Sequence, residues 1–475
     1  MMEHKASTKG SALVLLIIIA ILAVSILYYE AAPHIPILIG IMVAAVYGFK
    51  LRYRWHEMEG EIVKGISNGI PAILILSLIG TLIGVWVLNG TVQTITYYGL
   101  QILSPATFLI STVIITAIVA IMTGSSLSAM GTIGVSLMGV SYGMGVEPAM
   151  TAGAIVSGAL FGDKLSPLSD TTNLAAAAAK TNIFEHIRHM LWTTIPALII
   201  ALIIFGLIGV FTHDGAASTG QIDEMMQVLQ SEFPISIVTL LSPLVIIGLA
   251  MKRIKPIPAL SLGLIVAALT TFFTMPGSTF GDIINAAHFG YEAETGHEAI
   301  DELLTLGGLE SMLFGVSLII IALAFGGLIQ GIGIAAALIE GIKQALRSRG
   351  NTIASTLASS FGVNVVTGEQ YLSIILPAQM YEDSYRHHNL HPKNLSRTVE
   401  DGGTILHPLI PWGVIGAFVM TTLNVGMEYV FFVFLSLVTP FIALFYAYTG
   451  WTLTKLDENK EERKVEQNDD STKNM

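Results

Sequence analysis

Cysteine is absent from the 475 residues of this chain, which excludes disulfide bonds, thiol catalysis and iron–sulfur ligation. Charged residues are also scarce: they make up 12% of the sequence, whereas a soluble domain carries about 25%. The sequence lacks a zinc-binding H-E-x-x-H motif and a phosphate-binding P-loop, so neither ATP-driven transport nor a bound cofactor is expected. The formal net charge of −11 argues against nucleic acid as a partner.

Long hydrophobic runs dominate the sequence. Hydrophobic residues form 53% of the chain, and its mean hydropathy is +0.70. Several runs without Asp, Glu, Lys, Arg or His approach or exceed the roughly 20 residues that a helix needs to cross a bilayer. These runs are residues 12–28, 70–89, 191–211, 235–251, 257–280, 311–339 and 430–454. The sequence therefore predicts an all-α polytopic protein in a lipid membrane, with about 11–14 membrane segments.

Positive charges lie almost entirely on one side of the predicted spans. Alternation of the spans groups the following segments, which hold 22 of the 23 Lys and Arg residues: the N-terminus, 50–64, 180–190, 252–256, 343–350, 386–397 and the tail. The opposite loops, 212–234 and 276–310, contain neither residue. By the positive-inside rule, both termini are expected in the cytoplasm. Segment 386–397 is expected to be a solvated basic loop.

The two halves of the chain share short motifs in the same order. The matching pairs are His34–Pro36 with Pro256–Pro258, Asn89-Gly90 with Gln330-Gly331, Thr123-Gly124 with Thr367-Gly368, and Gly162–Asp170 with Gly403–Pro411. The first pair starts from opposite sides of the membrane, which predicts two inverted repeats, at 34–234 and 235–452. An anchor helix (1–33) precedes them, and a disordered cytoplasmic tail (453–475) follows. Inverted repeats are typical of secondary transporters.

Glycine and proline interrupt corresponding helices in both halves. Because these residues weaken or break a helix, discontinuous helices are expected at Gly162 and Pro167, and again at Gly403 and Pro408. Asp170 is expected to cap the helix that restarts after the first break. The Thr123-Gly124 and Thr367-Gly368 pairs are expected to form kinks or the tips of re-entrant hairpins. Paired breaks of this kind indicate a binding site near the middle of the membrane.

Polar residues near the breaks have the chemistry of a cation site. Na⁺ prefers oxygen ligands, and we expect them from Asp163 and Asp170, with Ser166, Thr171, Thr172 and Asn173 as accessory groups. In the second half, Glu369, Asp401 and His407 are candidates for carrying a proton. Lys164 is the one Lys or Arg residue outside the cytoplasmic segments, and it is expected either to neutralise the charge of Asp163 or to bind an anion. A carboxylate in a low dielectric holds a proton more tightly, so a proton and Na⁺ can compete for it.

Other classes of membrane protein fit less well. Gly65–Gly69 matches the G-x-S-x-G nucleophile pattern, but it opens a hydrophobic helix and has no matched His and Asp. We therefore do not expect this protein to be an enzyme. A channel usually forms its pore from several subunits, whereas this chain already contains two halves and a central site.

The residues around the breaks resemble the signature of the NhaC family of sodium/proton antiporters, within the ion transporter superfamily. The resemblance covers about residues 30–450, and its most specific segments are Gly162–Leu174, Glu369–Ser373 and Glu400–Gly413. It implies extrusion of Na⁺, often also Li⁺, against H⁺ in a bacterial plasma membrane. Some relatives look like exchangers of malate for lactate or carriers of amino acids, so a Na⁺- and H⁺-coupled exchanger of small carboxylates is the alternative. Whether the chain forms a homodimer is open.

Overall fold

The described part of the chain consists of helices and short links. A computed structural model describes residues 6–29, 31–211, 219–293, 295–297, 300–301, 304–305, 307–343 and 348–456. Within these ranges there is no strand; an isolated antiparallel bridge joins Leu390 and Lys455. The all-α prediction is confirmed for this part of the chain.

The helices up to residue 232 include two π-helical turns. In chain order they are α1 (Thr8–Ala23), the π turn Val24–Tyr28, α2 (His34–Lys50), α3 (Trp55–Asn68), α4 (Ile70–Leu88), α5 (Thr91–Ile102), α6 (Pro105–Thr123), α7 (Ser126–Ala129), the π turn Met130–Gly134, α8 (Val135–Met144), α9 (Pro148–Leu165), α10 (Asp170–Ala178), α11 (Ile183–Phe211) and α12 (Thr219–Glu232).

The remaining helices include one π turn and several 3₁₀ turns. In chain order they are the 3₁₀ turn Ile237–Leu240, α13 (Leu241–Met251), α14 (Pro256–Thr274), α15 (Phe280–Phe289), the 3₁₀ turn Glu310–Met312, α17 (Leu313–Gly331), α18 (Ile334–Lys343), α19 (Arg349–Thr367), α20 (Gln370–His387), α21 (Pro392–Glu400), the π turn Asp401–Ile405, the 3₁₀ turn His407–Leu409, α22 (Val414–Thr422), the 3₁₀ turn Met427–Phe432 and α23 (Phe434–Thr449).

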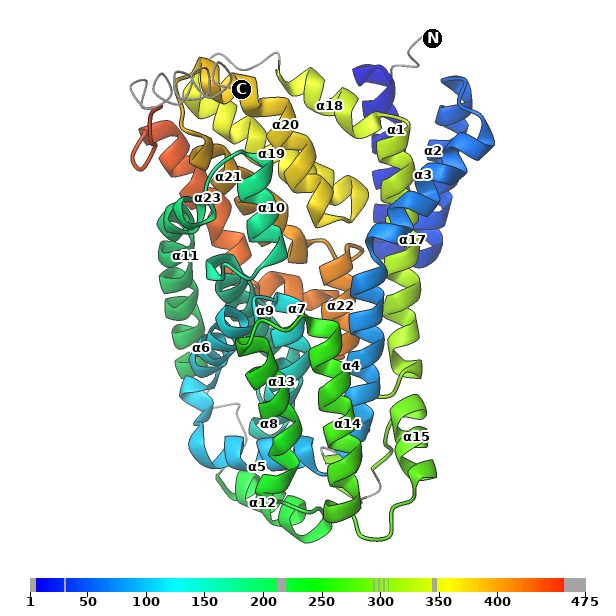
Figure 1. Ribbon diagram of the computed structural model, residues 1–475, viewed down its shortest axis with the longest axis vertical. Coiled ribbons are helices and arrows are strands. Elements are labelled where there is room, and N and C mark those ends of the chain that lie inside the picture. Colours follow the sequence, from blue (N-terminus) through cyan, green and yellow to red (C-terminus); the bar gives the residue numbers. More distant parts are fainter. Residues whose placement is uncertain are drawn as a thin grey trace, which may run out of the picture.

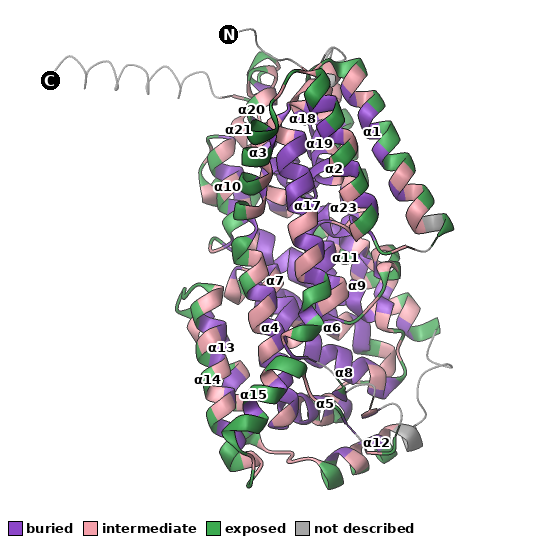
Figure 2. Ribbon diagram, turned by 90° about the vertical axis from the view of Figure 1, so that its right-hand side faces the viewer, coloured by how far each residue is buried: buried purple, intermediate pink, exposed green. Residues whose placement is uncertain are grey.

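The helices form an elongated bundle with different sets of elements at its two ends (Figure 1). Helices α18, α20 and the start of α1 lie at one end, while α5 and α12 lie at the other (Figure 1). Helices α4 and α17 run between these ends in opposite directions (Figure 1). Buried residues concentrate in central helices such as α9 and α17, whereas outer helices such as α1 show exposed faces (Figure 2).

Within the described residues, eight helical segments are long and apolar enough to cross a membrane, or nine when the bent pair of α12 and α13 is counted as one span. This is fewer than the 11–14 expected. Part of the difference comes from α2 and α23, which are apolar but short. Helices α19 and α20 carry many polar residues and pack against other helices. Because a helix enclosed by protein does not face lipid, it need not be apolar.

Two glycines allow α9 to pack closely against α6. A side chain at Gly158 or Gly162 would collide with the backbone oxygens of Val113 and Ala117 on α6, which is the role of small residues between membrane helices. Helix α9 continues through Gly162 as far as Leu165. The predicted break at Gly162 is therefore wrong in position: the glycine lies within the helix and serves packing, and the interruption falls between α9 and α10.

Helices end at Thr123-Gly124 and at Thr367-Gly368, the two pairs expected to form kinks or hairpin tips. Helices α6 and α19 both stop at the threonine, and both following glycines adopt a left-handed φ of 65°. In each case the next side chain caps a new helix: Ser125 accepts a hydrogen bond from the Ser128 amide, and Glu369 accepts one from the Leu372 amide. The same local geometry therefore turns the chain in both halves.

These two glycines should tolerate substitution differently. At Gly124 an added Cβ would lie 2.5 Å from the Leu168 Cβ, whereas at Gly368 the nearest atom is 3.4 Å away. The left-handed backbone alone costs about 1–2 kcal/mol. We expect Gly368→Ala to lower the free energy of unfolding by about that amount, and Gly124→Ala to lower it by more. The measurement is the melting temperature in detergent, which should fall further for Gly124→Ala. Equal losses for the two variants would contradict the packing of Gly124 on Leu168.

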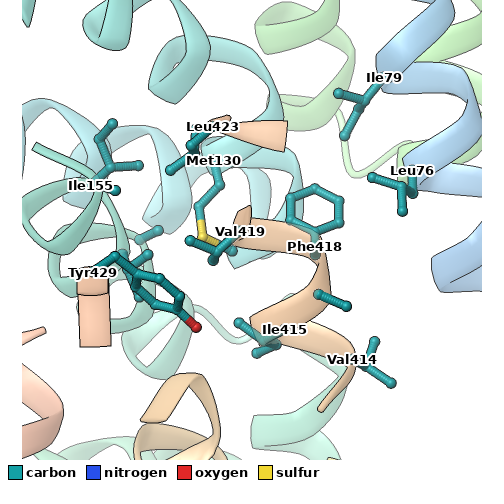
Figure 3. Packing of buried hydrophobic residues seen from close by; sticks show 14 of the residues in the cluster. Leu76, Ile79, Met130, Ile155, Val414, Ile415, Phe418, Val419, Leu423 and Tyr429 are labelled. Carbon is teal, nitrogen blue, oxygen red and sulfur yellow. The ribbon is translucent and has the colours of Figure 1, made fainter. Parts of the chain in front are cut away.

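Hydrophobic side chains from distant segments meet around α22. Phe418 and Val419 of α22 lie among Met130, Ile155 and Ile79, which come from the first π turn after α7, from α9 and from α4 (Figure 3). All five are buried. Burying apolar side chains is worth about 1.5–3 kcal/mol each, so this cluster fastens a second-half helix onto first-half helices.

The segment after α23 is held against the protein. The Leu453–Leu456 stretch, expected to begin a disordered tail, hydrogen-bonds to residues before and within α21: the His391 amide donates to the Thr454 carbonyl at 3.0 Å, and the Leu456 amide donates to Asn389 at 3.2 Å. The folded part therefore reaches Leu456. Residues 457–475 of the expected tail lie outside the described residues.

Candidate functional site

A four-residue link separates α9 from α10. Ser169 is the cap of α10, and its hydroxyl accepts a hydrogen bond from the Thr172 amide at 3.3 Å. The prediction that Asp170 is the cap is therefore wrong: Asp170 is the first residue of the helix. The Asn173 side chain donates to the carbonyls of Pro167 (2.9 Å) and Ser169 (2.7 Å). Asn173 and Pro167 thus stabilise the link, and Asn173 satisfies two of its free carbonyls.

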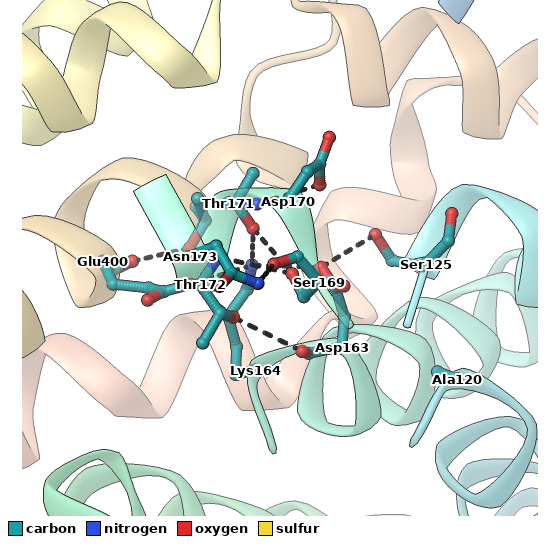
Figure 4. Close-up of polar contacts among 12 residues, drawn as sticks. Ala120, Ser125, Asp163, Lys164, Ser169, Asp170, Thr171, Thr172, Asn173 and Glu400 are labelled. Atoms are coloured by element: carbon teal, nitrogen blue, oxygen red, sulfur yellow. Dashed lines mark hydrogen bonds and ion pairs between the residues drawn. The ribbon is translucent and has the colours of Figure 1, made fainter. Parts of the chain in front are cut away.

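Lys164, in the last turn of α9, lies at the centre of a buried polar cluster. Its Nζ is 3.0 Å from Asp163 Oδ2 and 3.1 Å from Glu400 Oε1. It also donates to the Thr171 hydroxyl at 2.6 Å. Figure 4 shows these groups converging on the lysine from α9, α10 and α21. The Lys164 side chain is fully buried, so it does not reach solvent at the membrane surface.

Glu400 connects the lysine to a histidine of α11. Its Oε2 lies 2.6 Å from His186 Nε2, and the His186 Nδ1 lies 2.8 Å from the Ser396 hydroxyl. Thr172 donates to Glu400 Oε1 at 3.2 Å. Glu400 and His186 are both fully buried. We call Asp163, Lys164, Thr171, His186 and Glu400 the Lys164 cluster.

The charges of this cluster do not cancel when its histidine is neutral. Two carboxylates, Asp163 and Glu400, then face one ammonium group, Lys164, so one negative charge remains. Asp163 Oδ1 has no hydrogen-bond partner although it is buried. An uncompensated charge in a low dielectric is costly. The cluster can therefore gain stability from a single monovalent cation, either a proton or a metal ion.

Asp170 lies apart from this cluster. Its carboxylate accepts hydrogen bonds from the Thr171 amide at 2.9 Å and from the hydroxyl of Tyr371 on α20. The residue is exposed, whereas Asp163 is buried. The structure thus gives the two aspartates different hydrogen-bond partners: Asp163 bonds within the cluster and Asp170 bonds to the second half of the chain.

Ser166 ties the break to the neighbouring α6 tip. Its hydroxyl donates to the Ile121 carbonyl at 2.9 Å, while Thr123 bonds only to backbone carbonyls beside it. In the second half the Val414 amide donates to the Gly368 carbonyl at 3.0 Å. In both halves, then, the end of α6 or α19 hydrogen-bonds to a residue in or just after the break of its own half.

Two further predicted carboxylates are buried in the second half. Glu369 caps α20, with Oε2 2.7 Å from the Leu372 amide, and the Glu369 amide bonds to the Thr367 hydroxyl. Asp401 opens the π turn after α21, where its Oδ1 accepts a hydrogen bond from Thr193 at 3.0 Å. Its Oδ2 is buried without a hydrogen-bond partner. The structure shows neither group in direct contact with Lys164.

His407 belongs to a separate polar group at the second break. Its Nδ1 lies 2.9 Å from Asn364 Oδ1, and its Nε2 is buried without a partner. Asn364 also donates to the Gly403 carbonyl, and the Pro408 carbonyl accepts a hydrogen bond from Tyr429 at 2.6 Å. Gly403 and Pro408 are thus held by side chains of α19 and of the turn that contains Tyr429.

Several residues of the site are not evident from the motifs. The sequence places Glu400 in the Glu400–Gly413 segment near the second break but does not indicate that it meets Lys164, and it gives no motif for His186 and Thr193 of α11. The signal that could have found the last two is their spacing: His186, His189 and Thr193 share one face of an otherwise apolar helix and are all buried. Buried polar residues inside a membrane helix commonly mark function.

The groups around Lys164 suit a hard monovalent cation. Carboxylate, hydroxyl and carbonyl oxygens converge there, and these are the ligands that such cations prefer. No cluster of three or more His, Cys, Asp or Glu that could hold a resident metal ion occurs among the described residues.

A cavity of about 630 Å³ opens beside the end of α22. Its lining includes Tyr291, Glu292, Thr422 and Asn424, together with Val135 of α8. Val419 of α22 precedes these lining residues in the chain, Leu423 lies between Thr422 and Asn424, and both belong to the buried hydrophobic cluster (Figure 3). At α22 the cavity therefore borders closely packed apolar side chains.

Comparison with known proteins identifies a family to which the sequence is similar. The model of the Na⁺/H⁺ antiporter family matches residues 158–451. The Na⁺/H⁺ antiporter NhaC of Alkalihalophilus pseudofirmus is 44% identical over 450 residues, or 94% of this chain and 97% of that protein. NhaC of Bacillus subtilis is 41% identical, covering 93% and 98%. The malate-2H⁺/Na⁺-lactate antiporter of Bacillus subtilis is 35% identical, covering 92% and 94%.

Proposed function

The chain belongs to the Na⁺/H⁺ antiporter family, and from this premise we propose that it exchanges Na⁺ for H⁺ across a membrane at the Lys164 cluster. The resemblance of its motifs to the NhaC family is confirmed by the two NhaC relatives. Eight or nine apolar helices among the described residues agree with an integral membrane protein.

The observation that carries this proposal is the charge of the Lys164 cluster. With His186 neutral the cluster has one net negative charge, and with His186 protonated it has none. One Na⁺ beside the free Oδ1 of Asp163 would neutralise the cluster equally well. Because one site cannot accommodate both positive charges without repulsion, binding of Na⁺ expels the proton and binding of the proton expels Na⁺. That competition is the basis of exchange.

We propose that the two halves form an inverted repeat, which would support alternating access. Helices α6 to α10 match α19 to α22 in order, with left-handed glycines after α6 and α19. In each half a hydrogen bond joins the end of α6 or α19 to a residue in or just after the break. In Figure 1, α5 and α8 lie at one end of the bundle, and α18 and α20 lie at the other. We infer that the tips enter as re-entrant hairpins from opposite sides. Exchanging the conformations of two such halves would open the site to each side in turn.

The same arrangement suggests an orientation in the membrane. The junctions of α2 with α3 and of α20 with α21 carry basic residues and lie at the upper end in Figure 1. Helices α12 and α15, which carry acidic residues and no Lys or Arg, lie at the lower end. By the positive-inside rule the upper end faces the cytoplasm of a bacterial plasma membrane, together with both termini.

Exchange of small carboxylates is the competing function. The more distant malate/lactate relative favours it, and a binding site for an organic anion would need a free cation. Lys164 is the expected one, but both Asp163 and Glu400 already pair with it. A substrate carboxylate would have to displace a buried carboxylate to reach it. The pairing of Lys164 therefore argues against an anion site at this lysine and favours the simple ion exchanger there.

Everted membrane vesicles test the proposal. With a pH-sensitive dye, we expect NaCl or LiCl alone to dissipate the proton gradient. Adding malate or lactate should not increase this response. The control is the same vesicle preparation without the protein. A response that requires Na⁺ together with malate or lactate would instead assign the chain to the carboxylate exchangers.

A further inference from the structure

A buried arginine lies one helical turn from Asp401. Arg397, on α21, is only 2% exposed, although the segment that contains it was expected to be a solvated basic loop. That expectation is wrong for Arg397, because α21 is packed among α11, α19 and α20. The Asp401 amide donates to the Arg397 carbonyl, so the two residues occupy successive turns of one helix and lie on the same face.

The arginine is held by the end of the chain. Its Nη1 donates to the Thr452 hydroxyl at 3.1 Å, and its guanidinium lies 5.8 Å from the centre of the Tyr446 ring. Among the described residues no carboxylate lies within salt-bridge distance of it. Thr452 itself adopts a left-handed φ of 75°, which is rare for a β-branched residue and persists only where the surroundings impose it.

The segment from Thr452 to Leu456 is anchored at several further points. Asn394 of α21 donates to the Thr454 carbonyl at 2.7 Å, and the Thr454 amide donates to Asn394 Oδ1 at 3.1 Å. We call Thr452–Leu456 the strap. Because its contacts reach the same short helix that carries Arg397 and Glu400, the strap fixes the helix and the direction of the guanidinium together.

Asp401 and Arg397 are complementary but unpaired. Asp401 Oδ2 is buried without a hydrogen-bond partner, and only one of the five N–H groups of the guanidinium has an acceptor among the described residues. Burying opposite charges near one another without pairing them is costly, and the hydrogen bond to Thr452 holds the guanidinium to the strap. Arg397 lies three and four residues before Glu400 and Asp401 in the chain, so its positive charge can act on both carboxylates without occupying their oxygens.

We propose that Arg397, held by the strap, is a positioning residue that weakens cation binding at Glu400 and Asp401 so that the bound cation can leave. The proposal rests on the proposed function, because it concerns the site of exchange. A fixed positive charge close to the carboxylates lowers their affinity for Na⁺. Fast turnover requires that affinity to be moderate, since an ion bound too tightly is released slowly.

Kinetics of Na⁺-driven proton release in proteoliposomes test this. We expect Arg397→Gln to lower KM for Na⁺ by roughly tenfold and to lower kcat as well, whereas Arg397→Lys should keep KM close to that of the wild type. Thr452→Val preserves the shape and branching of the strap residue but removes the hydroxyl, so its KM should lie between those of the wild type and Arg397→Gln.

The outcomes separate this inference from the proposed function. If the wild type does not exchange Na⁺ for H⁺, the proposed function fails. If the wild type exchanges and Arg397→Gln lowers kcat or yield with an unchanged KM, Arg397 is merely structural and the inference is wrong. Equal defects in the Lys and Gln variants would also overturn it. Should Arg397→Gln not fold, an unchanged KM in Thr452→Val decides against the inference.

Discussion

Replacing Asp163 by asparagine is expected to reduce Na⁺-driven proton release at least about a hundredfold while leaving the protein folded. The substitution removes the one net negative charge of the Lys164 cluster, which is worth roughly 3 kcal/mol of cation binding. Because Glu400 still pairs with Lys164, no buried charge is left alone. The measurement is dye dequenching in everted vesicles, together with the melting temperature of the purified protein.

Two further aspartates provide controls for this variant. Asp383→Asn changes an exposed residue of α20 in the same way and should keep full activity. Asp170→Asn tests the sequence-based expectation of a paired Na⁺ site, because Asp170 is exposed and bonds to Tyr371. We expect a smaller loss for Asp170→Asn than for Asp163→Asn. Normal exchange by Asp163→Asn would refute the proposed site.

Replacing Lys164 by glutamine is expected to destabilise the protein by about 3–5 kcal/mol. The ammonium group stands between Asp163 and Glu400 at 3.0 and 3.1 Å, and without it two buried negative charges face each other. The expected fall in melting temperature is about 5–10 °C. Adding Na⁺ should restore part of it, since a ligand of the folded state stabilises that state.

A double variant tests whether charge is the reason. Lys164→Gln combined with Glu400→Gln leaves only the charge of Asp163, so the cluster returns to one net negative charge. We expect the double variant to be more stable than Lys164→Gln alone, which is a large favourable coupling between the two positions. If the two losses simply add, Lys164 stabilises the fold by packing rather than by neutralising carboxylates.

Much of the architecture follows from local sequence features. Long apolar runs must form membrane helices because a bilayer offers no water to backbone groups. Gly124 and Gly368 end their helices because a left-handed φ suits glycine. The same reasoning identified Asp163 and Lys164, since charged residues within an apolar stretch require a partner. These features act within a few residues, so the order of amino acids suffices to reveal them.

Helix boundaries were predicted less well. Gly162 was expected to break α9, but it lies within the helix and packs on Ala117. Asp170 was expected to cap α10, but Ser169 does so. In both cases the local pattern allowed either role, because glycine serves close packing as well as helix ends, and serine caps helices as well as aspartate does. Contacts with neighbouring helices decided between the roles.

The sequence by itself thus determined the class of protein, most of its apolar helices, the helix ends at Thr123 and Thr367, and Asp163 as a carboxylate near the first break. Only the tertiary structure decided which groups meet. Lys164 and Glu400 are far apart in the chain yet lie 3.1 Å apart, and His186 joins them from a third helix. Arg397 is buried because other helices surround α21. Contacts between helices depend on how whole faces pack, and no local pattern of residues specifies which faces meet.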